Sequence, residues 1–103
     1  MSDDYGSYNG STKAPDYEQD IDEILDYQFN WAAKLNGDTI ATSTFTFPDG
    51  LAEDSRSNTD TTTTVFVDAA GGSCGSVYRV TNHVVTDGGR EMDKTIRILI
   101  VEN

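Results

Sequence analysis

Beyond about residue 23, apolar and polar residues alternate along the chain in short runs that turn-forming residues separate. Successive side chains of a strand point to opposite faces of a sheet, so this alternation is typical of half-buried strands. The runs are rich in threonine, valine, isoleucine and aromatic residues, which strands prefer. No window of ten residues has the spacing of an amphipathic helix. The pattern predicts strands over residues 26–35, 39–47, 54–58, 61–68, 76–86 and 91–101.

The same alternation predicts which side chains of three of these strands point into a core. The expected inward faces are Tyr27, Phe29, Trp31, Ala33 and Leu35; Tyr78, Val80, Asn82 and Val84; and Met92, Lys94, Ile96, Ile98 and Ile100. The opposite face of the strand at 76–86 carries Val77, Arg79, Thr81, His83 and Val85. We therefore expect these last side chains on the outer surface of a sheet.

A glycine-containing hairpin joins the last two predicted strands. Cross-strand neighbours point to the same side of a sheet, so aligning Val80 with Ile98 requires an odd number of loop residues. A three-residue loop over residues 88–90 meets this condition and supplies a glycine for a positive φ. In this register Arg79, Thr81, His83 and Val85 lie beside Leu99, Arg97, Thr95 and Asp93.

Tyr78 stands at the entry of a long strand, two residues before a core valine. Immunoglobulin-like sandwiches place a tyrosine there, and its hydroxyl bonds to the chain just upstream. Trp31 supplies the large buried aromatic residue on which a small sandwich core depends. We therefore expect an all-β fold, a single immunoglobulin-like β-sandwich over residues 24–103 with an extended acidic N-terminal arm.

The expected arm, residues 1–23, carries seven acids and one base, which is −6 of the net charge of −11. Glycine, serine and Pro15 break any period, so we expect it to be flexible until assembled. Yet Tyr5, Tyr8 and Tyr17, three of the five tyrosines, lie in it. Two readings stay open: a solubilising leader, or an assembly element whose tyrosines anchor to a neighbouring subunit.

Composition narrows the classes of partner. A chain of 103 residues matches one domain, and a net charge of −11 with scattered bases disfavours nucleic acid and anionic membrane surfaces. The opening MSDDYGSYNG is unlike a basic, apolar signal peptide. One cysteine suits a reducing cytoplasm. The acids at 16–23 lack the mid-loop glycine of a calcium loop, so we expect no metal and no cofactor.

The single cysteine and the single histidine do not form a thiol-based active site. Cys74 lies in a glycine-rich loop and His83 well inside a predicted strand. An extended segment from residue 76 to His83 spans ~23 Å, whereas a nucleophile and its base lie ~3 Å apart. We therefore expect Cys74 to be a loop thiol, His83 an outward strand residue, and the protein not to be an enzyme.

Three segments together resemble a known family: DYQFNWAAKLNGDTIATSTFTFPDGL, NTDTTTTVFV and VYRVTNHVVTDGGREMDKTIRILIVE. Their order and spacing are similar to those of the immunoglobulin-like fibre–tail adaptor family of tailed bacteriophages. The resemblance runs from about Asp20 to the C-terminus. It implies a non-enzymatic structural protein of the virion tail, assembled in the host cytoplasm. The implied partners are the connector ring, the tail fibre and neighbouring copies in a ring.

Two other classes remain open: a capsid decoration protein, because fold alone does not determine function, and an enzyme or carbohydrate-binding module. Decoration proteins differ from adaptors in copy number, and a binding module would gather exposed aromatic residues on one face. The outward face of the last hairpin and the tyrosines of the arm are the expected partner-binding elements. The candidate residues are Tyr5, Tyr8, Tyr17, Arg79, His83, Arg97 and Leu99.

Overall fold

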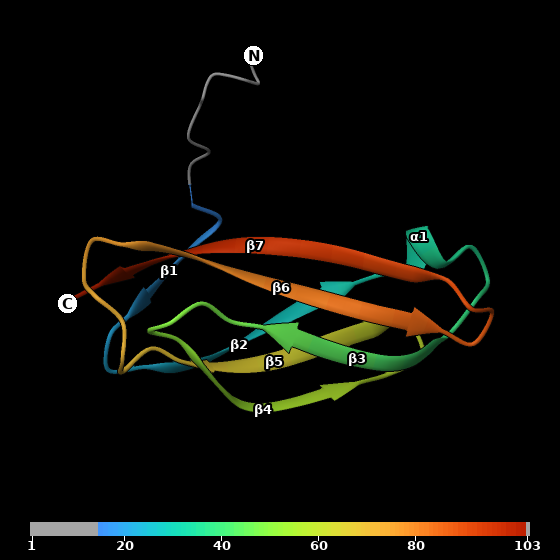
Figure 1. The fold of residues 1–103 in the computed structure, drawn as a ribbon, viewed down its shortest axis with the longest axis horizontal. Coiled ribbons are helices and arrows are strands. Elements are labelled where there is room, and N and C mark those ends of the chain that lie inside the picture. The colour runs from blue at the N-terminus through green and yellow to red at the C-terminus, as the bar shows by residue number, and fades with distance from the viewer. Residues whose placement is uncertain (1–14, 103) are drawn as a thin grey trace, which may run out of the picture.

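The structure, a computed structural model, describes residues 15–102. They form two sheets packed face to face (Figure 1). One sheet has the strand order β1-β7-β6-β3 and the other β2-β5-β4. The elements are β1 (Tyr17–Asp20), β2 (Ile24–Asn30), α1 (Ala32–Leu35), β3 (Ile40–Thr46), β4 (Ala52–Asn58), β5 (Thr62–Asp68), β6 (Val77–Thr86) and β7 (Glu91–Val101). The expected all-β sandwich is confirmed.

The strands expected at 39–47, 61–68, 76–86 and 91–101 agree with β3, β5, β6 and β7 to within one residue at each end. β4 begins two residues earlier than the pattern predicts, at Ala52. All of its residues are exposed because it lies at the edge of its sheet. Polar residues on such an edge discourage pairing with other chains.

The strand expected over residues 26–35 is wrong in its second half, because β2 ends at Asn30 and the short helix α1 follows. Trp31 and Leu35 are both buried, and the Leu35 N–H donates to the Trp31 carbonyl at 3.0 Å. A spacing of four residues puts two side chains on one face of either a strand or a helix. Ala33 distinguishes the two, and it is exposed rather than buried.

The expected arm boundary at residue 23 lies too late, because β1 belongs to the sandwich and pairs in parallel with β7. Gln19 is buried, and its Nε2 donates to the carbonyls of Val67 and Glu23, each at 2.8 Å. Its Oε1 accepts the hydroxyl of Tyr27 at 2.8 Å. One carboxamide therefore joins β1 to the opposite sheet. Residues 1–14 of the expected arm lie outside the described residues.

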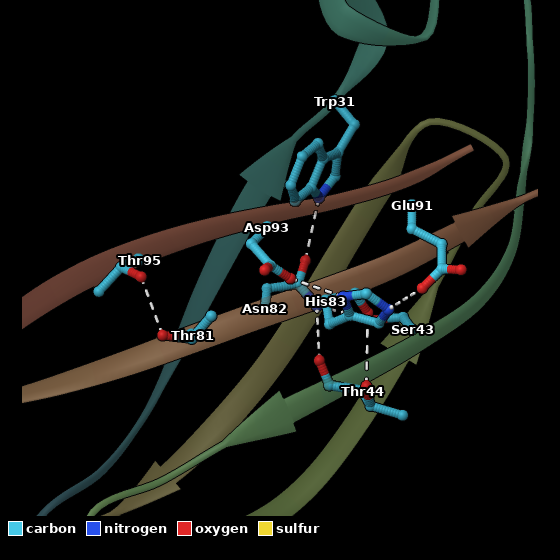
Figure 2. Close-up of polar contacts among 9 residues, drawn as sticks. All are labelled: Trp31, Ser43, Thr44, Thr81, Asn82, His83, Glu91, Asp93 and Thr95. Atoms are coloured by element: carbon cyan, nitrogen blue, oxygen red, sulfur yellow. Dashed lines mark hydrogen bonds and ion pairs between the residues drawn. The ribbon is translucent and has the colours of Figure 1, made fainter.

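A buried polar network crosses the centre of the sandwich (Figure 2). Asn82 of β6 accepts hydrogen bonds from Trp31 Nε1 at 3.0 Å and from Thr63 Oγ1 at 2.6 Å. Its Nδ2 donates to Ser43 Oγ and to the Thr44 carbonyl of β3, both at 3.0 Å. Buried polar groups cost free energy unless they are hydrogen-bonded, and here every polar atom of the amide is bonded. The packing role expected for Trp31 is confirmed.

The tyrosine corner expected at Tyr78 is also present. The Tyr78 hydroxyl accepts the backbone N–H of Ser73 at 2.8 Å. Gly50 lies against the ring with φ 109°, and a Cβ at this position would be only 3.1 Å from the ring edge. The brace therefore depends on a glycine in the β3–β4 connection as well as on the tyrosine.

The hairpin register differs from the expected one by two residues. Val80 lies opposite Ile96 rather than Ile98, and the three-residue loop is residues 87–89, with Gly89 at φ 89°. The reason is tertiary: Arg90 Nη1 donates to the Leu35 carbonyl at 3.0 Å, at the end of α1. This contact draws Arg90 out of the loop. A shift of two keeps every side chain on its expected face.

We predict that Gln19→Ala destabilises the domain by about 2–4 kcal/mol, because it leaves the Tyr27 hydroxyl and two carbonyls without a partner. A fragment starting at residue 24 should lose at least as much, whereas a chain starting at residue 15 should keep its stability. Urea unfolding measures all three. Glu18→Ala, an exposed change on the same strand, is the control. Equal midpoints for Gln19→Ala and Glu18→Ala would contradict this role of β1.

Candidate partner-binding surface

The outer surface of the β1-β7-β6-β3 sheet gathers the candidate residues of the last hairpin. Residues at even positions of β6, such as Val80, Asn82 and Val84, are buried, so the odd positions point outward. The same holds for β7, where Ile96, Ile98 and Ile100 are buried. The structure thus brings Arg79, His83, Arg97 and Leu99 onto one face. Their cross-strand neighbours differ by two residues from those that the sequence predicts, so Arg79 lies opposite Arg97 rather than Leu99.

Four side chains at one end of this surface form what we call the arginine face: Val77, Arg79, Arg97 and Leu99. Val77 lies opposite Leu99, and Arg79 lies opposite Arg97. Val77 is 46% exposed, a large value for a valine within a strand. Parity predicts that Val77 points outward, and its exposure makes it a candidate contact residue.

The two arginines are an unfavourable pair in the isolated chain. Like charges directly opposite each other on neighbouring strands destabilise a sheet. Within residues 15–102, no acid forms an ion pair with either guanidinium. Asp16 is near, but its carboxylate accepts the backbone N–H of Arg97, at 2.8 Å. An acidic partner that covers the arginine face would relieve this repulsion.

His83 lies on the same surface but is already paired (Figure 2). Its Nδ1 lies 2.6 Å from Asp93 Oδ1 and its Nε2 lies 3.2 Å from Glu91 Oε1. The hydrogen bond with Asp93 and the negative charges of both acids raise the pKa of His83, against a smaller opposing effect of burial. His83 therefore braces β6 against β7, and its charge is balanced within the chain.

The tyrosines expected to anchor the arm fall into two groups. Tyr5 and Tyr8 lie outside the described residues. Tyr17 belongs to β1, and its ring centroid lies 4.9 Å from that of Tyr27 in the same chain. It is still 44% exposed, at the edge of the sandwich rather than on the arginine face. Tyr17 thus contributes to its own fold.

Two motifs of the quoted segments meet at one end of the sandwich. Asp38 Oδ1 accepts the N–H of Gly88 at 3.1 Å and that of Thr39 at 2.8 Å. A Cβ on Gly88 would be 2.6 Å from Asp38 Oδ2, so a larger residue here would displace the Asp38 carboxylate. The side chain of Thr86 first, and these N–H groups after it, hold the pKa of Asp38 below its usual range. The role of Asp38 and Gly88 is therefore structural: their contact holds the last hairpin in place.

Other chemistry finds little support in the part of the chain that the structure describes. Cys74 is exposed with a free thiol, and both ring nitrogens of His83 are bonded to carboxylates. Residues 15–102 hold no group of three acids, histidines or cysteines placed to bind a metal ion. Within the same range, no helix has the length and apolar character to cross a membrane. The surface geometry fits contact with another protein.

Comparisons with known proteins agree with this picture. The model of the Gp77 family, described as podophage GP4 fiber-tail adaptor protein gp77, matches residues 19–99. The solution structure of the PKD domain from KIAA 1837 protein superposes with a TM-score of 0.50 at 17% identity, and the match covers 95% of this chain and 91% of that chain. At this identity the likeness concerns the fold alone. No curated protein matches the chain.

We predict that His83→Gln reduces stability more at about pH 5.5 than at about pH 8. The native pKa of His83 is raised. Its contribution is therefore fully present below the unfolded value near 6.5 and is lost as the pH rises through the native value. Thermal unfolding at both pH values measures the difference. Asp93→Asn, which removes the largest cause of the shift, should flatten it. An effect of His83→Gln that is independent of pH would contradict this role.

Proposed function

The chain belongs to the Gp77 family of podophage fibre–tail adaptor proteins, and we propose that it joins tail fibres or related appendages to the tail through contacts between proteins. The observation that carries the proposal is the extent of the family match, from Gln19 of β1 to Leu99 of β7. This span contains the whole buried core except Ile100. The family is one of structural adaptors, so we infer a structural rather than a catalytic role. Capsid decoration has no observation in its favour.

The arginine face is the docking surface in this proposal. It combines the exposed Val77, the half-buried Leu99 and a pair of arginines whose repulsion a partner would relieve. Apolar contacts supply most of the binding energy of such a surface, and charges supply orientation and selectivity. The sandwich beneath is held by the buried Asn82 network. All four residues of the arginine face lie in strands β6 and β7 rather than in loops.

The partners in this proposal are other proteins of the tail: the connector ring, the fibre and neighbouring copies of the adaptor. The site of action is the virion tail, after assembly in the host cytoplasm. Neither nucleic acid nor membrane is a partner, since the net charge of −11 repels both phosphate backbones and anionic lipid.

We predict that Arg79→Glu with Arg97→Glu lowers incorporation into tails by about tenfold or more, because two favourable charge contacts become repulsive. The melting temperature should change by less than about 3 °C, since one like-charge pair replaces another. Quantitative mass spectrometry of purified virions measures incorporation.

Lys34→Glu with Lys94→Glu is the matched control, because it makes the same change in net charge at two exposed positions away from the arginine face. Normal incorporation of the arginine double variant would contradict the proposed docking surface. Loss of incorporation by both double variants would indicate an effect of net charge alone.

We also propose that residues 1–14 bind a neighbouring protein of the tail through Tyr5 and Tyr8. A chain that starts at residue 15 keeps β1 and should therefore fold, yet it should fail to enter tails. Tyr5→Ala with Tyr8→Ala should reproduce this loss, whereas Asp3→Asn with Asp4→Asn, which removes charge but no ring, should cause a smaller one. The same virion assay measures all three variants. Incorporation of the shortened chain at the normal copy number would overturn this role.

A further inference from the structure

The outer surface of the opposite sheet carries a second exposed cluster. Ile24 of β2 is 48% exposed and Phe66 of β5 is 39% exposed. Asp26 lies opposite Phe66, and Ile24 lies opposite Asp68, so two apolar and two acidic side chains alternate in a square. All four point away from the core, because their neighbours Tyr27, Val65 and Val67 are buried. We call this cluster the aspartate face.

The acids of the aspartate face are not neutralised within the part of the chain that the structure describes. Within residues 15–102, neither Asp26 nor Asp68 forms an ion pair. Asp68 Oδ1 accepts the N–H of Ala70 at 2.9 Å. Ile24 and Phe66 are diagonal neighbours, within reach of each other's side chains across the pair. Exposed apolar side chains ringed by charge are typical of binding surfaces.

Charge is divided between the two sides of the sandwich. Residues 76–103, which contain β6 and β7, hold four acids and four bases and are neutral overall. The net charge of −11 belongs to residues 1–75, and −6 of it to residues 1–23. The strands of the β2-β5-β4 sheet carry four acids and one base, whereas those of the β1-β7-β6-β3 sheet carry four acids and three bases, so the β2-β5-β4 sheet is the more acidic of the two.

The two faces match in composition. The arginine face presents two apolar side chains and two positive charges, with the exposed Glu18 of β1 opposite Leu99 at its edge. The aspartate face presents two apolar side chains and two negative charges. Two arginine faces would repel each other, and so would two aspartate faces. An arginine face against an aspartate face instead pairs opposite charges and buries Val77 and Phe66.

We propose that the arginine face of one copy binds the aspartate face of a second copy. This inference rests on the proposed function and names the acidic partner of its docking surface. The two faces lie on opposite sides of one sandwich, so each copy can bind one neighbour on either side. Such head-to-tail contacts close into a ring when the rotation between copies allows it.

Charge exchange tests the contact, with the full chain in sedimentation-velocity experiments up to ~1 mM, where an interaction worth only about 4 kcal/mol is still visible. The wild type should associate. Arg79→Glu with Arg97→Glu makes both faces acidic, and Asp26→Arg with Asp68→Arg makes both basic, so each double variant alone should be monomeric. An equimolar mixture of the two should associate again, and so should the quadruple variant, in which the signs of the faces are exchanged.

Thermal unfolding checks that each variant is folded. The double variant Ile24→Ser with Phe66→Ser tests the same face in a second way, because it leaves the hydrogen bond between Asp68 and Ala70 intact. This variant should also reduce association by about tenfold or more. A monomeric wild type, or double variants that fail to associate both when mixed and when combined in one chain, would overturn the proposal. So would unchanged association of the serine variant.

Virion incorporation separates this inference from the proposed function. If Arg79→Glu with Arg97→Glu abolishes incorporation and the quadruple variant neither self-associates nor recovers incorporation, the docking surface stands but its partner is not a second copy. If charge exchange restores association in solution while every variant enters tails normally, the contact between copies stands and the arginine face is not needed for tail assembly.

Discussion

Asn82 lies in β6 with its amide fully buried, and it ties β6 to β3 and both to Thr63 of the opposite sheet and to Trp31, the residue that precedes α1. This network determines which side chains of β6 face the solvent as well as which face the core. A slip of β6 by one residue would turn Asn82 to solvent and bury Arg79. Leaving a buried carboxamide or guanidinium without partners costs several kcal/mol. The interior therefore determines which side chains the sheet displays.

The sandwich offers two flat outer sheets of different character. The β1-β7-β6-β3 sheet ends in the arginine face, whereas the β2-β5-β4 sheet is acidic around Ile24 and Phe66. An adaptor needs surfaces that bind proteins on more than one side at once, and strands hold such surfaces in a constant relation to each other. The polar contacts of the hairpin serve this presentation. His83 braces β6 to β7, and Asp38 clamps the loop that joins them.

Much of the fold can be predicted from side-chain parity, because buried and more exposed residues alternate along strands such as β6. Parity alone predicts that Arg79, His83, Arg97 and Leu99 lie together on the outside of the sandwich. The sequence pattern does not predict β1, because the residue that ties this strand to the core is a glutamine. Hydrophobic periodicity does not detect a buried amide. The pattern does not predict α1 either, because the spacing of Trp31 and Leu35 fits a strand and a helix equally well. The hairpin register depended on contacts of Arg90 with a distant segment.

The candidate site could be predicted only in part for the same reason. Parity shows which side chains share a face, but not which of them are already neutralised, as His83 is by Asp93 and Glu91. Cross-strand alignment across the whole β2–β5 pair was needed to bring Ile24, Asp26, Phe66 and Asp68 into one cluster. The family assignment came from the order and spacing of whole segments, and the family match over residues 19–99 confirms it.

In the proposed function, the arginine face is a contact surface in the assembled tail. Cryo-electron microscopy of the intact tail, at a resolution that shows side chains, tests it most directly. We predict that a neighbouring protein covers Arg79 and Arg97 and that its carboxylates lie within ion-pair distance of both guanidinium groups. A map in which the outer surface of β6 and β7 faces solvent in every copy would contradict it.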